Sequence, residues 1–163
     1  MEFDAAFDRL IGFEGGYANN AHDPGGETMF GVTNRVARAH NYRGDMRLLP
    51  RETAKAIYRS AYWDSIQADA LPDGLRFDVF DAAVNSGPAQ AVKWLQRVVG
   101  VIDDGLMGPT TIEAANRIDA KAAAAALIGQ RLDLMTSLPN WAGFSKGWCR
   151  RLASNLKALV AAE

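Results

Sequence analysis

The sequence predicts a mainly α fold, α+β overall, built as a single helical domain with a small β or loop element near residues 15–33. Three features support this prediction. Apolar residues recur at helical spacing through most of the chain, prolines stand at positions suited to helix starts, and glycine, asparagine and proline are concentrated in the 15–33 segment. A chain of 163 residues also buries roughly 70% of the surface of its unfolded form, so we expect it to fold without disulfides.

The first predicted element is an amphipathic helix at the N-terminus. Its apolar residues fall on one helical face: Phe3, Phe7, Leu10 and Ile11. Gly15 and Gly16 are expected to end this helix, which makes Glu14 the last side chain before the chain turns. The following segment, GGYANNAHDPGGETMFGVT, holds five glycines and one proline and predicts a loop with one short hairpin.

Six further helices are predicted after residue 50, because apolar residues recur there at helical spacing. Three of them begin at prolines, which suit the first turn of a helix: Pro50, Pro88 and Pro109. A fourth covers about residues 75–86. Its apolar stripe also contains Asp81, and a carboxylate in that position normally needs hydrogen-bond partners.

The last two helices are predicted from a possible N-cap and from a stripe of large apolar residues, respectively. Asp119 is a suitable N-cap for an alanine-rich helix that ends near Ser137. The final helix covers about 143–162, and one stripe is expected to be buried: Phe144, Trp148, Leu152, Leu156 and Leu159. The sequence contains no low-complexity linker, and the connection at 100–109 is the only candidate boundary within the chain.

Composition and charge exclude several classes of protein. Eighteen basic and nineteen acidic residues leave a formal net charge of -1, which argues against a dedicated nucleic-acid binder. The segment Lys146–Lys157 contains basic residues and no acid, so it is either a solvated helix face or a surface that attracts an anionic polymer. Cys149 is the only cysteine, so no intramolecular disulfide can form.

We expect neither a metal nor another cofactor. His22 and His40 are the only histidines, and neither has a partner at metal-ligand spacing. The glycine pairs lack the lysine of a phosphate loop, and the serines have no convincing partner histidine. The N-terminus MEFDAAFDRL lacks a basic segment followed by an apolar run, so we expect cytoplasmic synthesis without a signal peptide and no stable membrane insertion.

Glu14 is the first candidate catalytic residue. Cleavage of a glycosidic bond requires a carboxylic acid that keeps its proton until it donates it to the leaving oxygen, and burial at an apolar helix end favours the protonated form. Glu14 follows Ile11 and Phe13 and precedes two glycines that let a bulky substrate approach the backbone. The alternative is a solvated glutamate at a helix C-terminus, where its charge opposes the helix dipole.

Asp23 and Thr28 are the next candidates. A carboxylate and a hydroxyl close to a catalytic acid can hold and activate a water molecule. Each residue also has a structural alternative. Asp23 precedes a proline, which is common in turns, and Thr28 suits a β-strand in the segment TMFGVT.

Five segments of the first half carry a resemblance to a known family: EGGY at 14–17, DPGGET at 23–28, FGVT at 30–33, YRSAYWD at 58–64 and FDAAVNSGP at 80–88. They look like the glycoside hydrolase family 108 muramidases, typically phage or prophage endolysins. The resemblance implies a lysozyme-like fold and a catalytic acid at Glu14. The order Glu14, Asp23, Thr28 is also similar to that of phage lysozymes of the T4 type, although those leave five residues between aspartate and threonine and this chain leaves four.

The second half carries its own resemblance. AVKWLQRVVGVIDDGLMGPTTIEA at 91–114 resembles a peptidoglycan-binding motif, and GFSKGW at 143–148 looks like the end of the same region. We therefore expect a lysozyme-like catalytic region at 1–90 and a peptidoglycan-binding-like helical region at 91–163, integrated in one globular domain because no linker separates them. The alternative for Gly105, Gly108 and Pro109 is a purely structural role, with both glycines in tight turns at positive φ.

The resemblance implies an N-acetylmuramidase that hydrolyses the β-1,4 bond between N-acetylmuramic acid and N-acetylglucosamine in peptidoglycan. Glu14 is then the general acid, and Asp23, together with Thr28, positions water. We expect a monomer that lyses bacterial cells as an endolysin, acting in the periplasm after release by a holin-type system.

Sugar-binding sites commonly use aromatic faces and planar amides, so Tyr17, Tyr62 and Asn85 are candidate substrate contacts. Asn85 stands in a polar break directly after an apolar helix. Two other functions stay open at this point. The chain could be a non-catalytic peptidoglycan-binding protein, or a hydrolase of the chitosanase or chitinase type acting on a related β-1,4 aminosugar.

Overall fold

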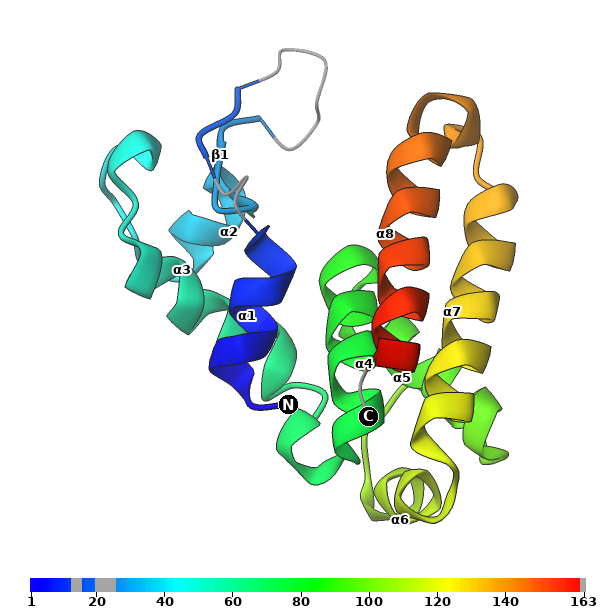
Figure 1. Cartoon of the computed structure of the whole chain (residues 1–163). Coiled ribbons are helices and arrows are strands. Elements are labelled where there is room, and N and C mark those ends of the chain that lie inside the picture. Colours follow the sequence, from blue (N-terminus) through cyan, green and yellow to red (C-terminus); the bar gives the residue numbers. More distant parts are fainter. Residues whose placement is uncertain (13–15, 20–25, 162–163) are drawn as a thin grey trace. The chain divides into compact units, whose positions relative to one another are not determined.

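The computed structural model describes residues 1–12, 16–19 and 26–161. This part of the chain is mainly helical with a small antiparallel sheet, which confirms the predicted fold class (Figure 1). It forms two compact units, an N-terminal unit, Glu2–Asp64, and a C-terminal unit, Ser65–Glu163 together with Met1. Within the described residues, none of the helices combines the length and the hydropathy that a membrane span requires. The expected division of the chain at residue 90 stays a prediction.

The N-terminal unit consists of short helices and one hairpin. Its elements in chain order are α1 (Phe3–Ile11), β1 (Thr28–Met29), β2 (Val32–Thr33), α2 (Asn34–Ala39), η2 (Met46–Leu48), α3 (Arg51–Tyr58) and η3 (Arg59–Trp63). The strands pair antiparallel, with Thr28 opposite Thr33. The short hairpin expected before residue 34 is therefore confirmed.

Aromatic side chains form the core of the N-terminal unit. The rings of Phe7 and Tyr58 meet edge to face with centroids 5.4 Å apart, and those of Phe3 and Trp63 do the same at 5.4 Å. All four side chains are buried. Such ring pairs add to the free energy of burial itself, so α1 is fixed against α3 and η3.

The end of α1 differs from the prediction. The helix ends at Ile11, and Gly12 follows it with φ +57°, a positive value that glycine adopts without a steric penalty. The α-helix thus ends three residues before the predicted stop at Gly15 and Gly16, and the predicted place of Glu14 at its end lies outside the described residues. The sequence analysis also missed α2, whose N-cap is Thr33: its hydroxyl accepts a hydrogen bond from Val36 N at 3.3 Å.

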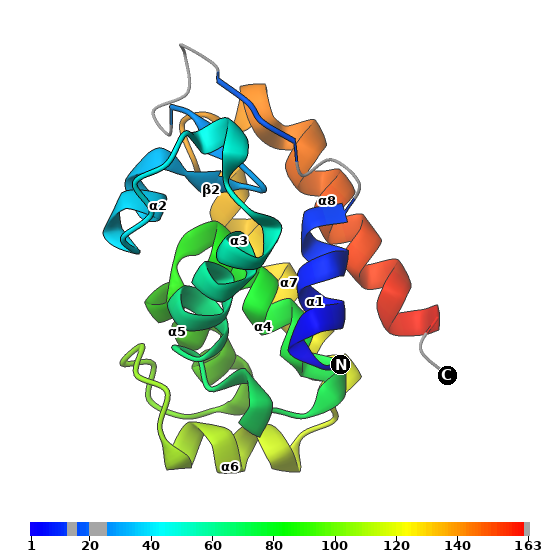
Figure 2. The same ribbon diagram turned by 90° about the vertical axis from the view of Figure 1, so that its left-hand side faces the viewer.

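The C-terminal unit is a bundle of longer helices. Its elements are η4 (Ala68–Ala70), α4 (Asp73–Ser86), α5 (Pro88–Val99), α6 (Pro109–Arg117), α7 (Ala120–Thr136) and α8 (Trp141–Ala161). Helix α4 packs against α5 and α7, and α7 packs against α8 (Figure 2). The predicted starts at Pro88 and Pro109 are confirmed, and Asp119 caps α7 by accepting a hydrogen bond from Ala122 N at 2.7 Å.

The predicted buried stripe of α8 is only partly buried. Leu152 is 3% exposed, whereas Phe144 is 57% exposed and Leu156 is 43% exposed. Within its unit α8 makes its main contact with α7, and Leu152 packs there with Ile128. One partner helix covers only part of an apolar stripe, so the residues at its margins remain accessible to solvent.

Candidate functional site

Two of the three predicted catalytic residues, Glu14 and Asp23, lie outside the described residues. Their roles therefore stay predictions. The structure describes the third, Thr28, and all three predicted substrate contacts, Tyr17, Tyr62 and Asn85.

Thr28 lies at the start of the hairpin. Its backbone N–H donates to Ala18 O at 2.8 Å and its carbonyl accepts from Ala18 N at 2.9 Å, so the segment at 16–19 runs alongside β1. The Thr28 hydroxyl donates to Ala18 O at 3.4 Å, which leaves the hydroxyl oxygen able to accept a hydrogen bond from water.

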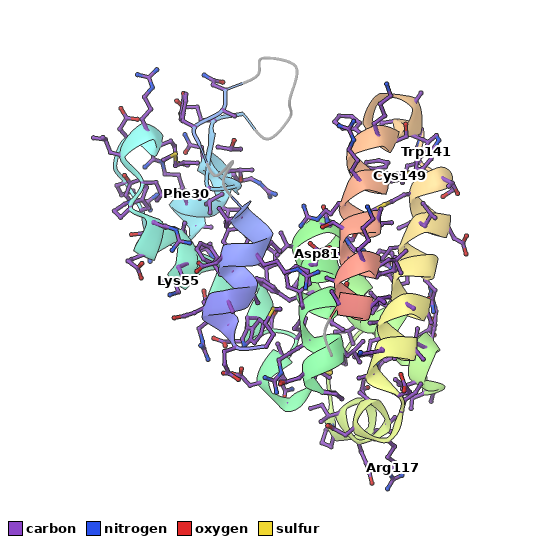
Figure 3. All side chains as sticks on the ribbon, viewed as in Figure 1. Phe30, Lys55, Asp81, Arg117, Trp141 and Cys149 are labelled. Atoms are coloured by element: carbon purple, nitrogen blue, oxygen red, sulfur yellow. The ribbon has the colours of Figure 1, made fainter. Side chains whose placement is uncertain are left out.

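The hairpin turn is fixed by Tyr58 from α3. The Tyr58 hydroxyl donates to Phe30 O at 3.1 Å. Phe30, labelled in Figure 3, and Gly31 both have positive φ, at 51° and 72°. A Cβ atom at Gly31 would lie 2.5 Å from the Tyr58 hydroxyl oxygen, so this position requires glycine both for its conformation and for the space. The hairpin that carries Thr28 is thus tied to the aromatic core.

Glu27 is a residue that the sequence analysis missed. Its carboxylate accepts a hydrogen bond from the Tyr17 hydroxyl at 2.7 Å and another from Asn34 Nδ2 at 3.1 Å. The guanidinium of Arg47 lies over the Tyr17 ring, 5.2 Å from its centroid. Glu27 therefore joins the predicted substrate contact Tyr17 to the start of α2, directly beside Thr28. Its place next to Thr28 within DPGGET was the only sequence signal available.

Tyr62 lies in η3 and is half-buried, with its ring 5.5 Å from that of Tyr58. Burial raises the pKa of the Tyr62 hydroxyl, and the charge of Arg35 opposes that rise. Tyr62 is therefore a neutral phenol at physiological pH. It belongs to the N-terminal unit, as do Tyr17 and Thr28, whereas Asn85 belongs to the C-terminal unit.

The C-terminal unit buries an ionic cluster around Asp81, which is labelled in Figure 3. Asp81 on α4 is 2% exposed, and Arg131 on α7 is fully buried. Arg131 Nη1 lies 2.7 Å from Asp81 Oδ2, and Arg151 of α8 reaches Asp81 Oδ1 through Nη2 at 2.5 Å and Nε at 2.8 Å. Asn155 Nδ2 also donates to Asp81 Oδ2 at 3.0 Å. The expectation that Asp81 needs hydrogen-bond partners is confirmed.

Two arginines keep Asp81 ionised. Burial alone would raise the pKa of this carboxyl, but the charges of Arg151 and Arg131 and their hydrogen bonds outweigh burial and hold the pKa below its usual range. Asn85, one helical turn after Asp81, joins the cluster from an exposed position. With its amide oriented to suit its neighbours, its oxygen accepts from Arg151 Nε at 3.0 Å and from Arg131 Nη2 at 3.1 Å.

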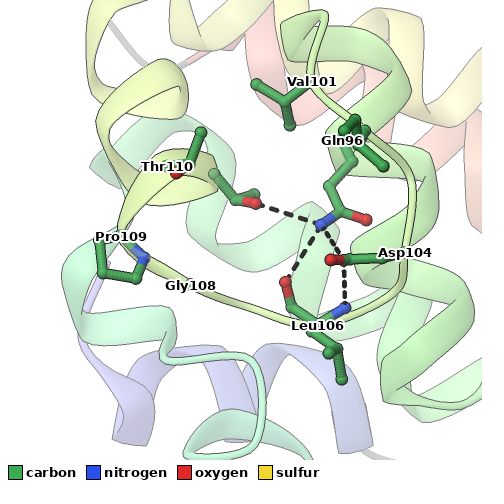
Figure 4. A pocket seen from close by; sticks show the side chains of 9 residues that line it. Gln96, Val101, Asp104, Leu106, Gly108, Pro109 and Thr110 are labelled. Carbon is green, nitrogen blue, oxygen red and sulfur yellow. Dashed lines mark hydrogen bonds between the residues drawn. The ribbon is translucent and has the colours of Figure 1, made fainter.

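A second buried polar group, Gln96 of α5, organises the loop at 100–108 (Figure 4). Its Nε2 donates to Asp104 Oδ1 at 2.7 Å, Leu106 O at 3.1 Å and Thr111 Oγ1 at 3.2 Å. Its Oε1 accepts from Gly105 N at 2.9 Å. The glutamine of the segment at 91–114 therefore holds the loop at 100–108 against α6.

The two glycines of this loop behave differently. Gly105 has φ +79°, as predicted. Gly108 has φ -136° and is the N-cap of α6, so the prediction of positive φ there is wrong. An extended conformation at Gly108 is open to any residue, and it directs the chain into Pro109 at the start of the helix.

Comparison with known proteins finds one family match in the first half of the chain and another in the second half. Residues 7–87 match the family model described as glycosyl hydrolase 108, and residues 90–153 match a model described as a predicted peptidoglycan domain. A solved structure, that of SagA from Brucella abortus, is 34% identical; the alignment covers 98% of this chain and 94% of that chain, with a TM-score of 0.88. This chain belongs to glycosyl hydrolase family 108. A comparison with curated proteins finds no match.

Membership of glycosyl hydrolase family 108 confirms the resemblance recognised in the sequence. The chain is a glycoside hydrolase, and its match to a peptidoglycan domain identifies peptidoglycan as the polymer on which it acts. The family match spans the segments EGGY and DPGGET, and the second match includes the loop that Gln96 holds.

Proposed function

We propose that this family 108 hydrolase is an N-acetylmuramidase, which cleaves the β-1,4 bond between N-acetylmuramic acid and N-acetylglucosamine. The observation that carries the proposal is the family match over residues 7–87, which includes both candidate carboxylates, Glu14 and Asp23. Glycoside hydrolysis ordinarily uses a pair of carboxyl groups, one as the proton donor and one as a base or nucleophile.

In this proposal Glu14 is the general acid and protonates the leaving glycosidic oxygen. Asp23 orients the water that attacks the sugar, and Thr28 assists it. The geometry of Thr28 supports this part, since its hydroxyl donates to a backbone carbonyl and keeps its oxygen available as an acceptor for that water.

Tyr17, Tyr62 and Asn85 are proposed to contact the glycan. Tyr17 has its hydroxyl bound to Glu27, so it offers the substrate its ring and not its hydroxyl. Asn85 is exposed and has its amide oxygen turned toward two guanidinium groups, so it offers its NH2 group as a donor.

The experiment compares wild type with Glu14→Gln on outer-membrane-stripped Gram-negative cells. Loss of turbidity is followed, circular dichroism verifies that each variant is folded, and mass spectrometry identifies the released fragments. Glu52→Gln is the matched control, because Glu52 is an exposed acid on α3 of the same unit. Glu27→Gln tests the second carboxylate near the hairpin.

We expect wild type and Glu52→Gln to clear the cells and to release fragments with reducing muramic acid ends, while folded Glu14→Gln does neither. Clearing by Glu14→Gln together with its loss in folded Glu27→Gln would move the acid to Glu27. Binding of sacculi without clearing by any variant would favour a non-catalytic binder. Release of sugar from chitin oligomers would favour a chitinase-type or chitosanase-type enzyme.

We also propose that the enzyme acts as a monomeric endolysin, which reaches the periplasm through a holin-type system and lyses bacterial cells. Lysis of expressing cells only when a holin is co-expressed tests this proposal. Lysis without any holin contradicts the proposed route of release and leaves the bond specificity untouched.

A further inference from the structure

The ionic cluster of the C-terminal unit carries more positive than negative charge. Asp81 supplies one negative charge, whereas Arg131 and Arg151 supply two positive charges. Asn155 and Asn85 complete the cluster with neutral amides. Helix α8 adds no compensating acid, since its residues 141–161 include four basic residues and neither aspartate nor glutamate. The contacts around Asp81 therefore join two positive charges to one carboxylate, and Asp78, a further buried acid of α4, lies one turn before it.

The two guanidinium groups extend from the core to the surface. Arg131 is fully buried, and its Nε has no hydrogen-bond partner among the described residues. The Arg151 side chain is 36% exposed, and Asn85 beside it is exposed. Two nitrogen atoms of Arg151 are bound within the cluster. Its Nε donates to Asp81 and Asn85, and its Nη2 pairs with Asp81. The third nitrogen, Nη1, has no acceptor among the described residues. The exposed edge of the cluster thus presents hydrogen-bond donors from Arg151 and Asn85.

An arrangement of this kind is suited to a carboxylate. A guanidinium group donates along two parallel directions that match the two oxygens of a carboxylate, and hydrogen bonds between charged groups are the stronger ones. Asp81 and Asn85 hold the Arg151 guanidinium in place before any ligand binds, so little side-chain freedom is lost on binding. The Arg151 side chain is 36% exposed, so an anion from solvent can reach it.

We propose that Arg151 and Asn85 form a binding site for a carboxylate of the peptidoglycan substrate. This inference rests on the proposed function and deepens it, because it assigns recognition of the substrate's negative charge to the C-terminal unit. Peptidoglycan offers two sources of that charge. One is the lactyl carboxylate of muramic acid where the peptide has been removed, and the other is the set of carboxylates on the peptide stem.

The test measures equilibrium binding of soluble disaccharide fragments by the intact chain. Three probes are used: the disaccharide of N-acetylglucosamine and N-acetylmuramic acid without peptide, the same disaccharide with its peptide stem, and both compounds with their carboxylates converted to neutral methylamides. Mass spectrometry after each titration verifies that the probes are intact. Binding is therefore measured without any catalytic turnover, so failure of the proposed role of Glu14 leaves this test unaffected.

Arg151→Gln is compared with Arg150→Gln, a matched control in which the neighbouring exposed arginine of the same helix is changed. We expect Arg151→Gln to weaken binding of at least one charged probe about tenfold or more, the size expected for a hydrogen bond to a charged group. Arg150→Gln should bind as wild type does. Wild type should bind the methylamide forms as weakly as Arg151→Gln binds the charged forms.

Asn85→Asp is the second variant, because Arg151→Gln also removes a partner of Asp81. The new carboxylate has nearly the shape of the asparagine amide and lies beside two guanidinium groups, so the fold should be retained or stabilised while binding of the charged probes is lost. The probe that responds identifies the source: the bare disaccharide for the lactyl group, the peptide-bearing one for the stem. Wild-type binding by folded Asn85→Asp, or an equal effect of Arg151→Gln on charged and methylamide probes, would overturn the proposal.

Discussion

Two buried polar networks of the C-terminal unit, around Gln96 and around Asp81, differ in charge and in how completely their groups are hydrogen-bonded. Gln96 is neutral, and both ends of its amide are bound by groups of the loop at 100–108 and of α6. The Asp81 cluster is ionic and joins two guanidinium groups to one carboxylate. A closed neutral network fixes local structure, whereas an ionic network that reaches the surface with hydrogen-bond donors is suited to binding.

The largest effect is expected from Asp81→Asn. This change leaves two guanidinium groups without their counterion, and one of them, Arg131, is fully buried. Breaking a buried pair by removal of one partner typically costs about 3–5 kcal/mol in the free energy of unfolding. Urea denaturation followed by circular dichroism measures it. Asp133→Asn, at an exposed acid on α7, is the control and should change stability by less than about 0.5 kcal/mol.

The effect of Asp81→Asn on the free energy of unfolding is expected to depend on pH. Because the pKa of Asp81 is lower in the folded protein than in the unfolded chain, its contribution to stability is fully present above the unfolded pKa, about 3.9. It is lost as pH falls through the lower folded pKa. The difference in stability between wild type and Asp81→Asn should therefore be constant from neutral pH to about pH 5 and shrink below about pH 4. A difference that shrinks already at pH 6 would contradict the assigned direction.

An intermediate effect is expected from Gln96→Leu. The leucine keeps the apolar contacts of α5 but removes the partners of Gly105 N, Leu106 O and Thr111 Oγ1. Leaving buried polar groups unsatisfied costs about 1–3 kcal/mol, so at neutral pH the loss should be smaller than that of Asp81→Asn. Gln90→Leu, on the same helix, is the control for helix propensity and hydrophobicity. A loss as large as that of Asp81→Asn would remove the contrast between the two networks.

The helical part of this fold could be predicted because local patterns determine it. Prolines and Asp119 locate the starts of α5, α6 and α7, and α4 was predicted from its apolar spacing. The short helix α2 was missed, because six residues carry too few apolar positions to establish a period. The end of α1 was misplaced because three glycines follow within five residues, and only the three-dimensional structure shows that Gly12 is the C-cap, with positive φ.

The candidate site shows the limit of sequence analysis more clearly. The position of Asp81 on an apolar stripe indicated that it needs partners, but those partners are Arg131, Arg151 and Asn155, which lie 50 to 74 residues away in the chain. Local periodicity carries no information about such pairs. Likewise Glu27 could not be predicted as a site residue, because its hydrogen bonds to Tyr17 and Asn34 exist only once the hairpin has formed.

The smallest effect is expected from Glu113→Gln, which removes an ion pair of the same chemical kind from the surface of the same unit. Glu113 pairs with Arg117 one turn later on α6, and both side chains are mostly exposed. Water already solvates both charges, so the loss should be about 0.3–0.5 kcal/mol and should decrease further in high salt. Urea denaturation at low and high ionic strength measures it. A loss at Glu113→Gln as large as that at Asp81→Asn would contradict burial as the cause of the large effect at Asp81.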